Sequence, residues 1–272
     1  TTTTLPAPLA VALAARPVAA GDPVALAEQI TVAEGAVRDP ATAPDVAAAA
    51  GHLQQVVYRQ LGVHPEWDAD VLARVPPELA ESVQLNAQAR RAFRSMHRRL
   101  ADTLPAWRIV EPEPADVLLA HYREAEAAFG VGWHYLAAIN LVETGMGRIR
   151  GTSVAGAQGP MQFMPGTWER YGEGDINSAQ DSILAAARYL HANGGADPGG
   201  IEFALYRYNN HNAYVRGVMA HARVMELDPR AFVGYYHWQI YFLSAMGDVF
   251  LPVGYEATAP IPVADYLATH PQ

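Results

Sequence analysis

Apolar residues recur every three or four positions through most of the chain, which is the spacing of one face of an α-helix. Proline at the first helical position and glycine after the last divide this pattern into separate helices. The predicted helices cover residues 23–37, 44–62, 77–100, 114–129, 132–143, 179–192, 204–208 and 213–225, with short ones from Pro65 and Pro165. We therefore expect a mainly α-helical protein.

The pattern changes near the C-terminus. Aromatic and β-branched residues flank the four residues 245–248, Ala-Met-Gly-Asp, which is typical of a β-hairpin. Two interpretations stay open for the rings of His237, Trp238, Tyr241 and Tyr255. They line a groove in which sugars stack on aromatic faces, or they fill the core, which is the commoner role of such residues.

A proline-rich segment at residues 104–114 divides the chain. We predict an N-terminal helical region at 1–110, a catalytic domain at 111–228, and a hairpin and tail at 229–272 that pack on the catalytic domain. The arginines at positions 90, 91, 94, 98 and 99 form a basic run. This run either contacts an acidic glycan or is a solvated face paired with acidic residues, and the second reading is more common.

The composition excludes several classes of function. The chain has 272 residues, of which 50% are hydrophobic, and a net charge of -9, which argues against nucleic acid as a partner. It has no cysteine, and no apolar run is long enough for a transmembrane helix. The start lacks Met and a basic region, so we expect either a mature chain whose signal peptide has been removed or a trimmed chain. The first of these predicts an exported protein of the cell envelope or the extracellular space.

One carboxylate is a candidate for acid catalysis. Glu143 stands at the C-terminal end of the predicted helix 132–143, on a face that it shares with Ile139 and other apolar residues. Desolvation and the helix dipole at this end both disfavour a charged carboxylate, so they raise its pKa. Such an acid stays protonated near neutral pH and can donate a proton. The alternative is an ion pair between Glu143 and Arg148 or Arg150.

The segment after this helix carries a recognisable loop. Residues 153–165 read SVAGAQGPMQFMP, the pair Glu143-Thr144 precedes them, and the pair Tyr208-Asn209 follows. These three pieces, in this order, resemble the signature of soluble lytic transglycosylases, which belong to the lysozyme superfamily.

This resemblance covers roughly residues 115–225, and the run 147–177 is similar to the actinobacterial branch of the family. The chain departs from the family pattern at Arg207, where a small residue is usual. It also departs after Asn209, where the family has glycine and this chain has Asn210.

The resemblance implies a lysozyme-like helical domain that cleaves peptidoglycan between N-acetylmuramic acid and N-acetylglucosamine and leaves an anhydro-muramic end. Glu143 alone would act first as acid and then as base, whereas ordinary glycosidases use two carboxylates. The residues expected to bind the glycan are Ser153, Gln162, Met164, Tyr208 and Asn209. The implied partner is the glycan strand. No cofactor and no metal are implied, and protein partners stay open.

The resemblance also assigns finer roles within this set. Tyr208 is expected to donate a hydrogen bond close to the Glu143 carboxyl or to the bound sugar, and Asn209 to brace the site. The glycines at 151, 156 and 159 either let the backbone approach the glycan closely or simply form turns.

Two other functions compete with this one. In a lysozyme-type hydrolase, Asp175 or Asp181 would approach Glu143 across a gap that holds the attacking water. In a binding module, the chain would hold glycan without cutting it. The acidic run 173–181 suggests calcium ligands, but it lacks the glycine and the terminal glutamate of an EF-hand. We expect a turn there, with residue 177 or 178 capping the next helix.

Overall fold

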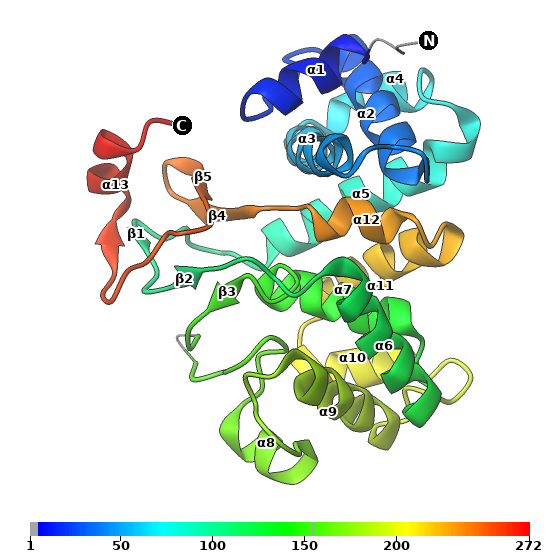
Figure 1. Cartoon of the computed structure of the whole chain (residues 1–272), viewed down its shortest axis with the longest axis vertical. Coiled ribbons are helices and arrows are strands. Elements are labelled where there is room, and N and C mark those ends of the chain that lie inside the picture. Colours follow the sequence, from blue (N-terminus) through cyan, green and yellow to red (C-terminus); the bar gives the residue numbers. More distant parts are fainter. Residues whose placement is uncertain (1–4, 154) are drawn as a thin grey trace. The chain divides into compact units, whose positions relative to one another are not determined.

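The computed structural model describes residues 5–153 and 155–272 (Figure 1). Within these residues the protein is mainly α-helical with small two-stranded sheets, as the periodicity predicts. No helix in this part of the chain is both long and apolar enough to cross a bilayer. The structure divides into two compact units, one of residues up to Ser95 with Arg216–Trp238, the other of Met96–Val215 with Gln239–Gln272. These boundaries differ from the domain boundaries expected from the sequence, which stay a prediction.

The first unit consists of helices. They are α1 (Ala7–Ala14), α2 (Pro23–Arg38), α3 (Pro44–Val63), the short 3-10 helix η1 (Pro65–Trp67), α4 (Asp68–Leu72), α5 (Pro77–Ser95), the C-terminal part of α11 (Asn212–Leu227) and α12 (Ala231–Tyr236). Asp22 starts α2 by accepting hydrogen bonds from two backbone N–H groups, as its position before Pro23 predicts. The predicted helix 77–100 ends earlier than expected, at Ser95.

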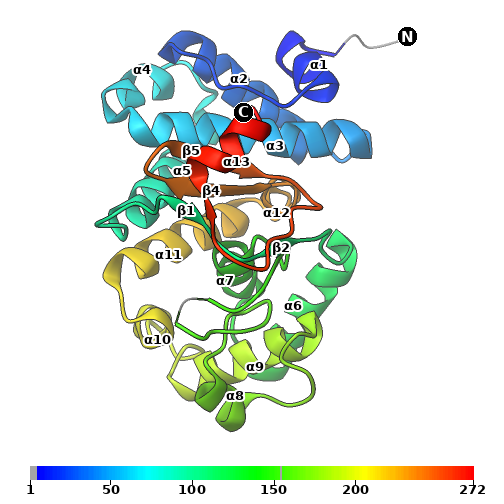
Figure 2. The same ribbon diagram turned by 90° about the vertical axis from the view of Figure 1, so that its left-hand side faces the viewer.

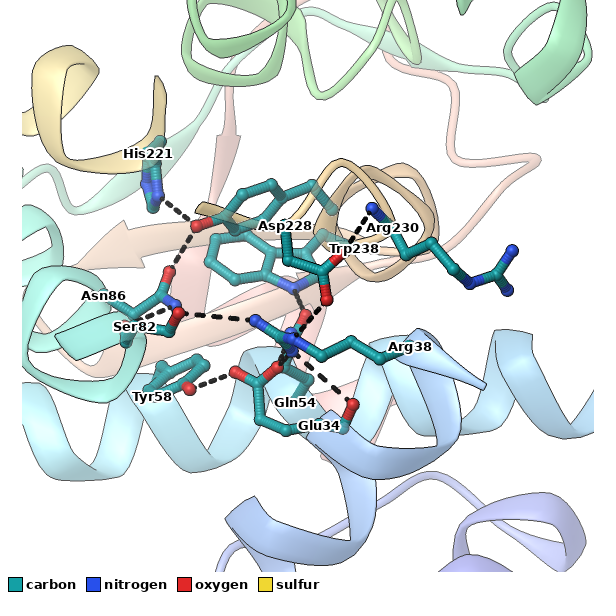
Figure 3. Close-up of polar contacts among 11 residues, drawn as sticks. Glu34, Arg38, Gln54, Tyr58, Ser82, Asn86, His221, Asp228, Arg230 and Trp238 are labelled. Atoms are coloured by element: carbon teal, nitrogen blue, oxygen red, sulfur yellow. Dashed lines mark hydrogen bonds and ion pairs between the residues drawn. The ribbon is translucent and has the colours of Figure 1, made fainter. Parts of the chain in front are cut away.

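A buried polar network lies at the centre of this unit (Figure 3). Glu34 of α2 is completely buried, accepts hydrogen bonds from Tyr58 and Gln54 of α3, and forms an ion pair with Arg38. The Arg38 guanidinium also lies 3.1 Å from an oxygen of Asp228. A buried carboxylate is costly unless it is paired in this way, so the network fixes how α2 and α3 pack.

The same network extends to the last residues of the unit, around α12 and Trp238. The Tyr235 hydroxyl donates to Asn86 at 2.7 Å and lies 3.1 Å from the His221 ring nitrogen. Trp238 donates its indole N–H to Gln54 at 2.9 Å. Burial lowers the pKa of His221 to about 3, so this histidine is neutral. Trp238 therefore has a structural contact in the first unit, which agrees with the core reading of this aromatic ring.

The second unit combines helices with short antiparallel strands. Its helices are α6 (Ala115–Phe129), α7 (Trp133–Thr144), α8 (Pro165–Tyr171), α9 (Ala179–Ala192), α10 (Ile201–Asn209), the N-terminal part of α11, and α13 (Val263–Thr269). Its strands are β1 (Thr103–Leu104), β2 (Arg108–Ile109), β3 (Ile149–Arg150), β4 (Ile240–Ser244), β5 (Gly247–Leu251) and β6 (Ile261–Pro262). The pairs are β1–β6, β2–β3 and β4–β5.

The predicted C-terminal hairpin is confirmed: β4 and β5 pair around a turn at residues 245–246. It lies together with β1, β6 and α13 (Figure 2), over a cluster of buried side chains. The cluster contains Leu104, Ile109, Ile240, Val249, Leu251, Tyr255, Val263 and Tyr266. Tyr255 is thus a core residue, and Ile149 of β3 packs against the same cluster. The C-terminal part therefore supports the strand that follows α7.

Candidate functional site

Helix α7 carries Glu143 at its C-terminal end, on a helix whose other side chains are mostly buried. Glu143 itself is half-buried, and its Oε1 accepts a hydrogen bond of 2.8 Å from the Tyr214 hydroxyl of α11. Burial raises the pKa of Glu143 to about 7, although the Tyr214 hydrogen bond acts in the opposite direction. A carboxyl with this pKa exists in both protonation states near neutral pH.

The alternative of a Glu143 ion pair with a neighbouring arginine is wrong. The Arg148 guanidinium donates to the Gly145 carbonyl at 3.1 Å, at the end of α7. Arg150 donates to the Asn177 carbonyl at 3.2 Å. The pKa of Glu143 is set by burial and by the Tyr214 hydroxyl, with no contribution from a cation. A paired carboxylate would have a lowered pKa, and this one is raised.

The chain turns sharply directly after the candidate acid. Gly145, Met146 and Gly147 all have positive φ, with values of 60, 64 and 83 degrees. The Gly145 and Met146 N–H groups bond back to carbonyls of the last turn of α7, which closes the helix. A Cβ at Gly145 would lie 2.5 Å from Ile240 Cδ1. Glycine at 145 is therefore required both by the backbone conformation and by the packing of β4.

A buried polar network fastens the signature loop to α7. The Pro160 carbonyl accepts hydrogen bonds from Thr144 Oγ1 at 2.6 Å and from the Asn140 side-chain amide at 2.9 Å. The Tyr122 hydroxyl of α6 donates to the oxygen of Asn140 at 2.6 Å. Thr144 and Asn140 are completely buried. Because Thr144 follows Glu143 in the chain, the network fixes the loop beside the candidate acid.

The loop itself is a tight hairpin. Gln158 and Phe163 exchange two backbone hydrogen bonds, of 2.9 and 2.8 Å. Gly159 has a φ of 73 degrees, and a Cβ there would lie 1.9 Å from the Ile176 carbonyl oxygen. Gly159 is thus a position of close backbone approach, but its neighbour is this chain's own backbone.

Three predicted substrate-binding residues lie on this loop. Ser153 Oγ accepts a hydrogen bond of 3.0 Å from the Ala157 N–H, so it also shapes the loop. Gln162 has a φ of 51 degrees, and its side-chain amide donates to the Gly159 carbonyl at 2.9 Å. Met164 is 45% exposed, which leaves its side chain available to a ligand. Residue 154, within the same motif, lies outside the described residues.

Tyr214, and not Tyr208, donates the hydrogen bond to Glu143, while the expected contact of Tyr208 with the sugar stays a prediction. The Tyr208 hydroxyl donates to the Met161 carbonyl at 2.7 Å, and Tyr214 occupies the position at the carboxyl. Burial and the nearby Glu143 raise the pKa of both tyrosines well above 10, so both remain neutral donors. Asn209 is exposed at the end of α10, and its side chain forms no hydrogen bond within the described part of the chain.

Tyr214 was missed because nothing in its local sequence distinguishes it. It lies in the first turn of α11, within a helix that the sequence does predict, and it is buried. The one sequence feature that could have pointed to Tyr214 is its position shortly after the Tyr208-Asn209 pair, since its ring carries a hydroxyl that can donate a hydrogen bond.

The acidic run before α9 forms a turn. Asp181 accepts a hydrogen bond of 2.8 Å from the Asp175 N–H, and Asp175 accepts one of 2.9 Å from the Asn177 N–H. Ser178 caps α9 by accepting from the Asp181 N–H, which confirms one of the two expected caps. Among the residues that the structure describes, no cluster of three His, Asp or Glu side chains is placed to hold a metal ion.

Comparison with known proteins supports an assignment for this region. Residues 121–224 match the model of the transglycosylase SLT domain. The chain is also 32% identical over 126 residues to membrane-bound lytic murein transglycosylase F of Thiobacillus denitrificans, a match that covers 44% of this chain and 27% of that protein. No solved structure matches the chain. The segment that holds Glu143, the signature loop and Tyr214 is therefore similar to a transglycosylase SLT domain.

Proposed function

We propose that the protein is a lytic transglycosylase that cleaves peptidoglycan between N-acetylmuramic acid and N-acetylglucosamine, with Glu143 as both acid and base. The observation that carries this proposal is the Glu143 carboxyl, which has a pKa of about 7 and lies within the segment that matches the SLT domain. A group that must donate and then accept a proton works best when its pKa is near the working pH.

The two steps use one proton of Glu143. Protonated Glu143 gives its proton to the glycosidic oxygen, and the bond from that oxygen to the muramic C1 breaks. The carboxylate left behind then takes the proton of the muramic C6 hydroxyl, whose oxygen bonds to C1 and closes the anhydro ring. The Tyr214 hydroxyl, 2.8 Å from Glu143 Oε1, stabilises the carboxylate between the two steps.

The surroundings of Glu143 favour this route over hydrolysis. An inverting hydrolase needs a second carboxylate about 6.5–9.5 Å from the acid, and this carboxylate activates the attacking water. Within the described part of the chain, no carboxylate contributes to the Glu143 pKa. The two candidates, Asp175 and Asp181, are used in the turn before α9. A single carboxylate agrees with a reaction in which the substrate supplies the attacking hydroxyl.

The residues proposed to contact the glycan are chosen because they lie on the loop next to Glu143. Ser153, Gln162 and Met164 lie on the loop that Thr144 fastens to α7, and Tyr208 holds the same loop through the Met161 carbonyl.

The chain spans 27% of the length of its relative, so that protein's membrane attachment is not transferred to this chain. Because peptidoglycan lies outside the cytoplasmic membrane, we propose that the protein acts in the cell envelope or outside the cell.

The test compares two glutamates of the same unit. Glu143→Gln keeps the size of the side chain but cannot cycle a proton, and we expect a loss of about 10²- to 10⁴-fold in wall-cleaving rate. Glu169→Gln, at an exposed position of α8, is the matched control and should retain the wild-type rate. Rates are measured by release of soluble fragments from purified peptidoglycan. Equal activity of wild-type and Glu143→Gln protein would falsify the assignment of the acid.

A further inference from the structure

Two arginines of the second unit face each other across paired strands. Arg108 of β2 and Arg150 of β3 occupy directly opposite positions of the antiparallel ladder. Directly opposite residues extend their side chains from the same face of the strands, with Cβ atoms about 5 Å apart. Like charges in such positions destabilise the pairing of the strands. The register thus brings two guanidinium groups to the same face of the strands.

Among the acidic residues that the structure describes, none pairs its side chain with these two guanidinium groups. Among the described residues, neither arginine takes part in an ion pair, and Arg150 donates only to the Asn177 carbonyl, at 3.2 Å. Glu256 is the backbone partner of Arg108 on the other edge of β2. The Glu256 side chain is exposed and forms no ion pair with Arg108. Two positive charges thus remain available at one place in a chain of net charge -9.

Both arginines line a pocket of about 410 Å³. This volume lies within the range of roughly 300–1,000 Å³ that is usual for small-molecule sites. The other residues of its lining are Val110, Ile149, Gly151, Gly159 and Asn177, of which Val110 and Ile149 are apolar. The pocket therefore combines apolar surface with two cationic hydrogen-bond donors, the composition of a site for an organic anion.

The pocket is joined to the candidate acid by short covalent and hydrogen-bonded links. Its wall residue Gly159 precedes Pro160, whose carbonyl accepts a hydrogen bond of 2.6 Å from Thr144. Thr144 in turn follows Glu143 at the end of α7. A ligand in the pocket thus contacts the same loop that is fastened beside Glu143.

We propose that this pocket binds a carboxylate of the peptide that muramic acid carries, with Arg108 and Arg150 as its two cationic contacts. The inference rests on the proposed function, because it takes the substrate to be peptidoglycan. Muramic acid bears a peptide on its lactyl group, and such peptides present free carboxylates. The planar guanidinium fork matches a carboxylate with two parallel hydrogen bonds. The pocket would make the enzyme prefer strands that still carry their peptides.

The test measures binding directly, by isothermal titration calorimetry on the full chain. The probes are muramyl dipeptide, which has one free carboxylate, and the same compound with that carboxylate esterified. Wild-type protein should bind the acid more tightly than the ester. Arg108→Gln and Arg150→Gln should each weaken binding of the acid roughly tenfold or more, because each removes hydrogen bonds to a charged group, and should leave the ester unaffected.

Matched variants separate this effect from damage to the fold. Arg123→Gln removes a surface arginine that pairs with Glu126 on α6, and it should bind both probes as wild type does. Replacing either pocket arginine removes a like-charge repulsion, so Arg108→Gln and Arg150→Gln should unfold at the wild-type temperature or above it. Glu256→Gln removes the nearest cross-strand carboxylate and should tighten binding of the acid.

Several results would overturn the inference. Equal affinity of wild-type protein for acid and ester would do so, as would an unchanged preference for the acid in Arg108→Gln and Arg150→Gln. Binding of inorganic phosphate at these arginines without binding of the dipeptide would assign the pocket to phosphate, against our proposal. Failure of the proposed function is a different result: wild-type protein would bind the dipeptide through the arginines but would not cleave peptidoglycan.

Discussion

The hydrogen bond between Tyr214 and Glu143 offers the sharpest prediction. Tyr214→Phe removes the hydroxyl that donates to Glu143 Oε1 at 2.8 Å and leaves the ring in the core. This hydrogen bond stabilises the ionised carboxylate, so it lowers the pKa of Glu143 against the larger effect of burial. Without it, the pKa of Glu143 must rise.

The size of the shift follows from the strength of such a bond. A hydrogen bond to a charged group contributes about 1.5–3 kcal/mol, and one pKa unit corresponds to about 1.4 kcal/mol. Water that enters in place of the hydroxyl recovers part of this, so we expect a rise of about one pKa unit. The wild-type pKa of about 7 would then move to roughly 8 in the variant.

The assay is the pH dependence of cleavage, with soluble fragments from purified peptidoglycan as the readout. In wild-type protein, activity should fall as pH rises through about 7, because the protonated acid disappears. In Tyr214→Phe this alkaline limb should move upward by about one pH unit. Tyr208→Phe is the control: its hydroxyl donates to the Met161 carbonyl, so the rate can change but the midpoint should stay. An unmoved or lowered midpoint in Tyr214→Phe would refute the reasoning.

Three further predictions concern stability. Because the folded state raises the Glu143 pKa from 4.5 to about 7, the folded chain binds an extra proton in that window, and the free energy of unfolding should fall as pH rises across it. The drop is on the order of 3 kcal/mol at most and should be missing in Glu143→Gln, as measured by urea titration at several pH values. Glu34→Gln should lower the free energy of unfolding by about 3–5 kcal/mol, because it breaks the ion pair of a completely buried carboxylate. The exposed Glu28→Gln of the same helix should change this free energy by about 0.5 kcal/mol or less in chemical denaturation. Gly159→Ala should lower the free energy of unfolding by about 1–3 kcal/mol and reduce cleavage, because the new Cβ would collide with the Ile176 carbonyl. In thermal unfolding and cleavage assays, the control Gly166→Ala should behave as wild type, because a Cβ at this position meets no other atom.

Helices with strong local signals could be predicted from the sequence, and those without them could not. Asp22 and Pro23 fix the start of α2, and Gly130 ends α6 in the left-handed conformation. The early end of α5 has no Pro or Gly signal. Its last residue, Ser95, donates its hydroxyl to the Ala92 carbonyl, a local bond that competes with the helix.

The short strands depend on tertiary contacts. The strands β1, β2, β3 and β6 have two residues each, too few to show a period of two. They form because distant segments pair, as Ile109 does with Ile149. Helix α13 was not predicted either, because its apolar residues pack on the buried cluster under the hairpin, and this cluster exists only in the folded structure.

The candidate site shows the same division. The raised pKa of Glu143 could be anticipated from its helix face, since both burial and helix end are local properties. The contact of Tyr214 with Glu143 could not be anticipated, because the two residues are 71 positions apart in the chain. The opposition of Arg108 and Arg150 also depends on a register that only the folded structure defines.

The most direct test of the central claim is the fate of water in the reaction. Peptidoglycan is digested by wild-type protein in water enriched in heavy oxygen, and the released fragments are analysed by mass spectrometry. If Glu143 takes the proton of the muramic C6 hydroxyl and no water attacks, the muramic ends are anhydro and carry no heavy oxygen. Reducing ends that contain heavy oxygen would contradict the account and make the protein a hydrolase.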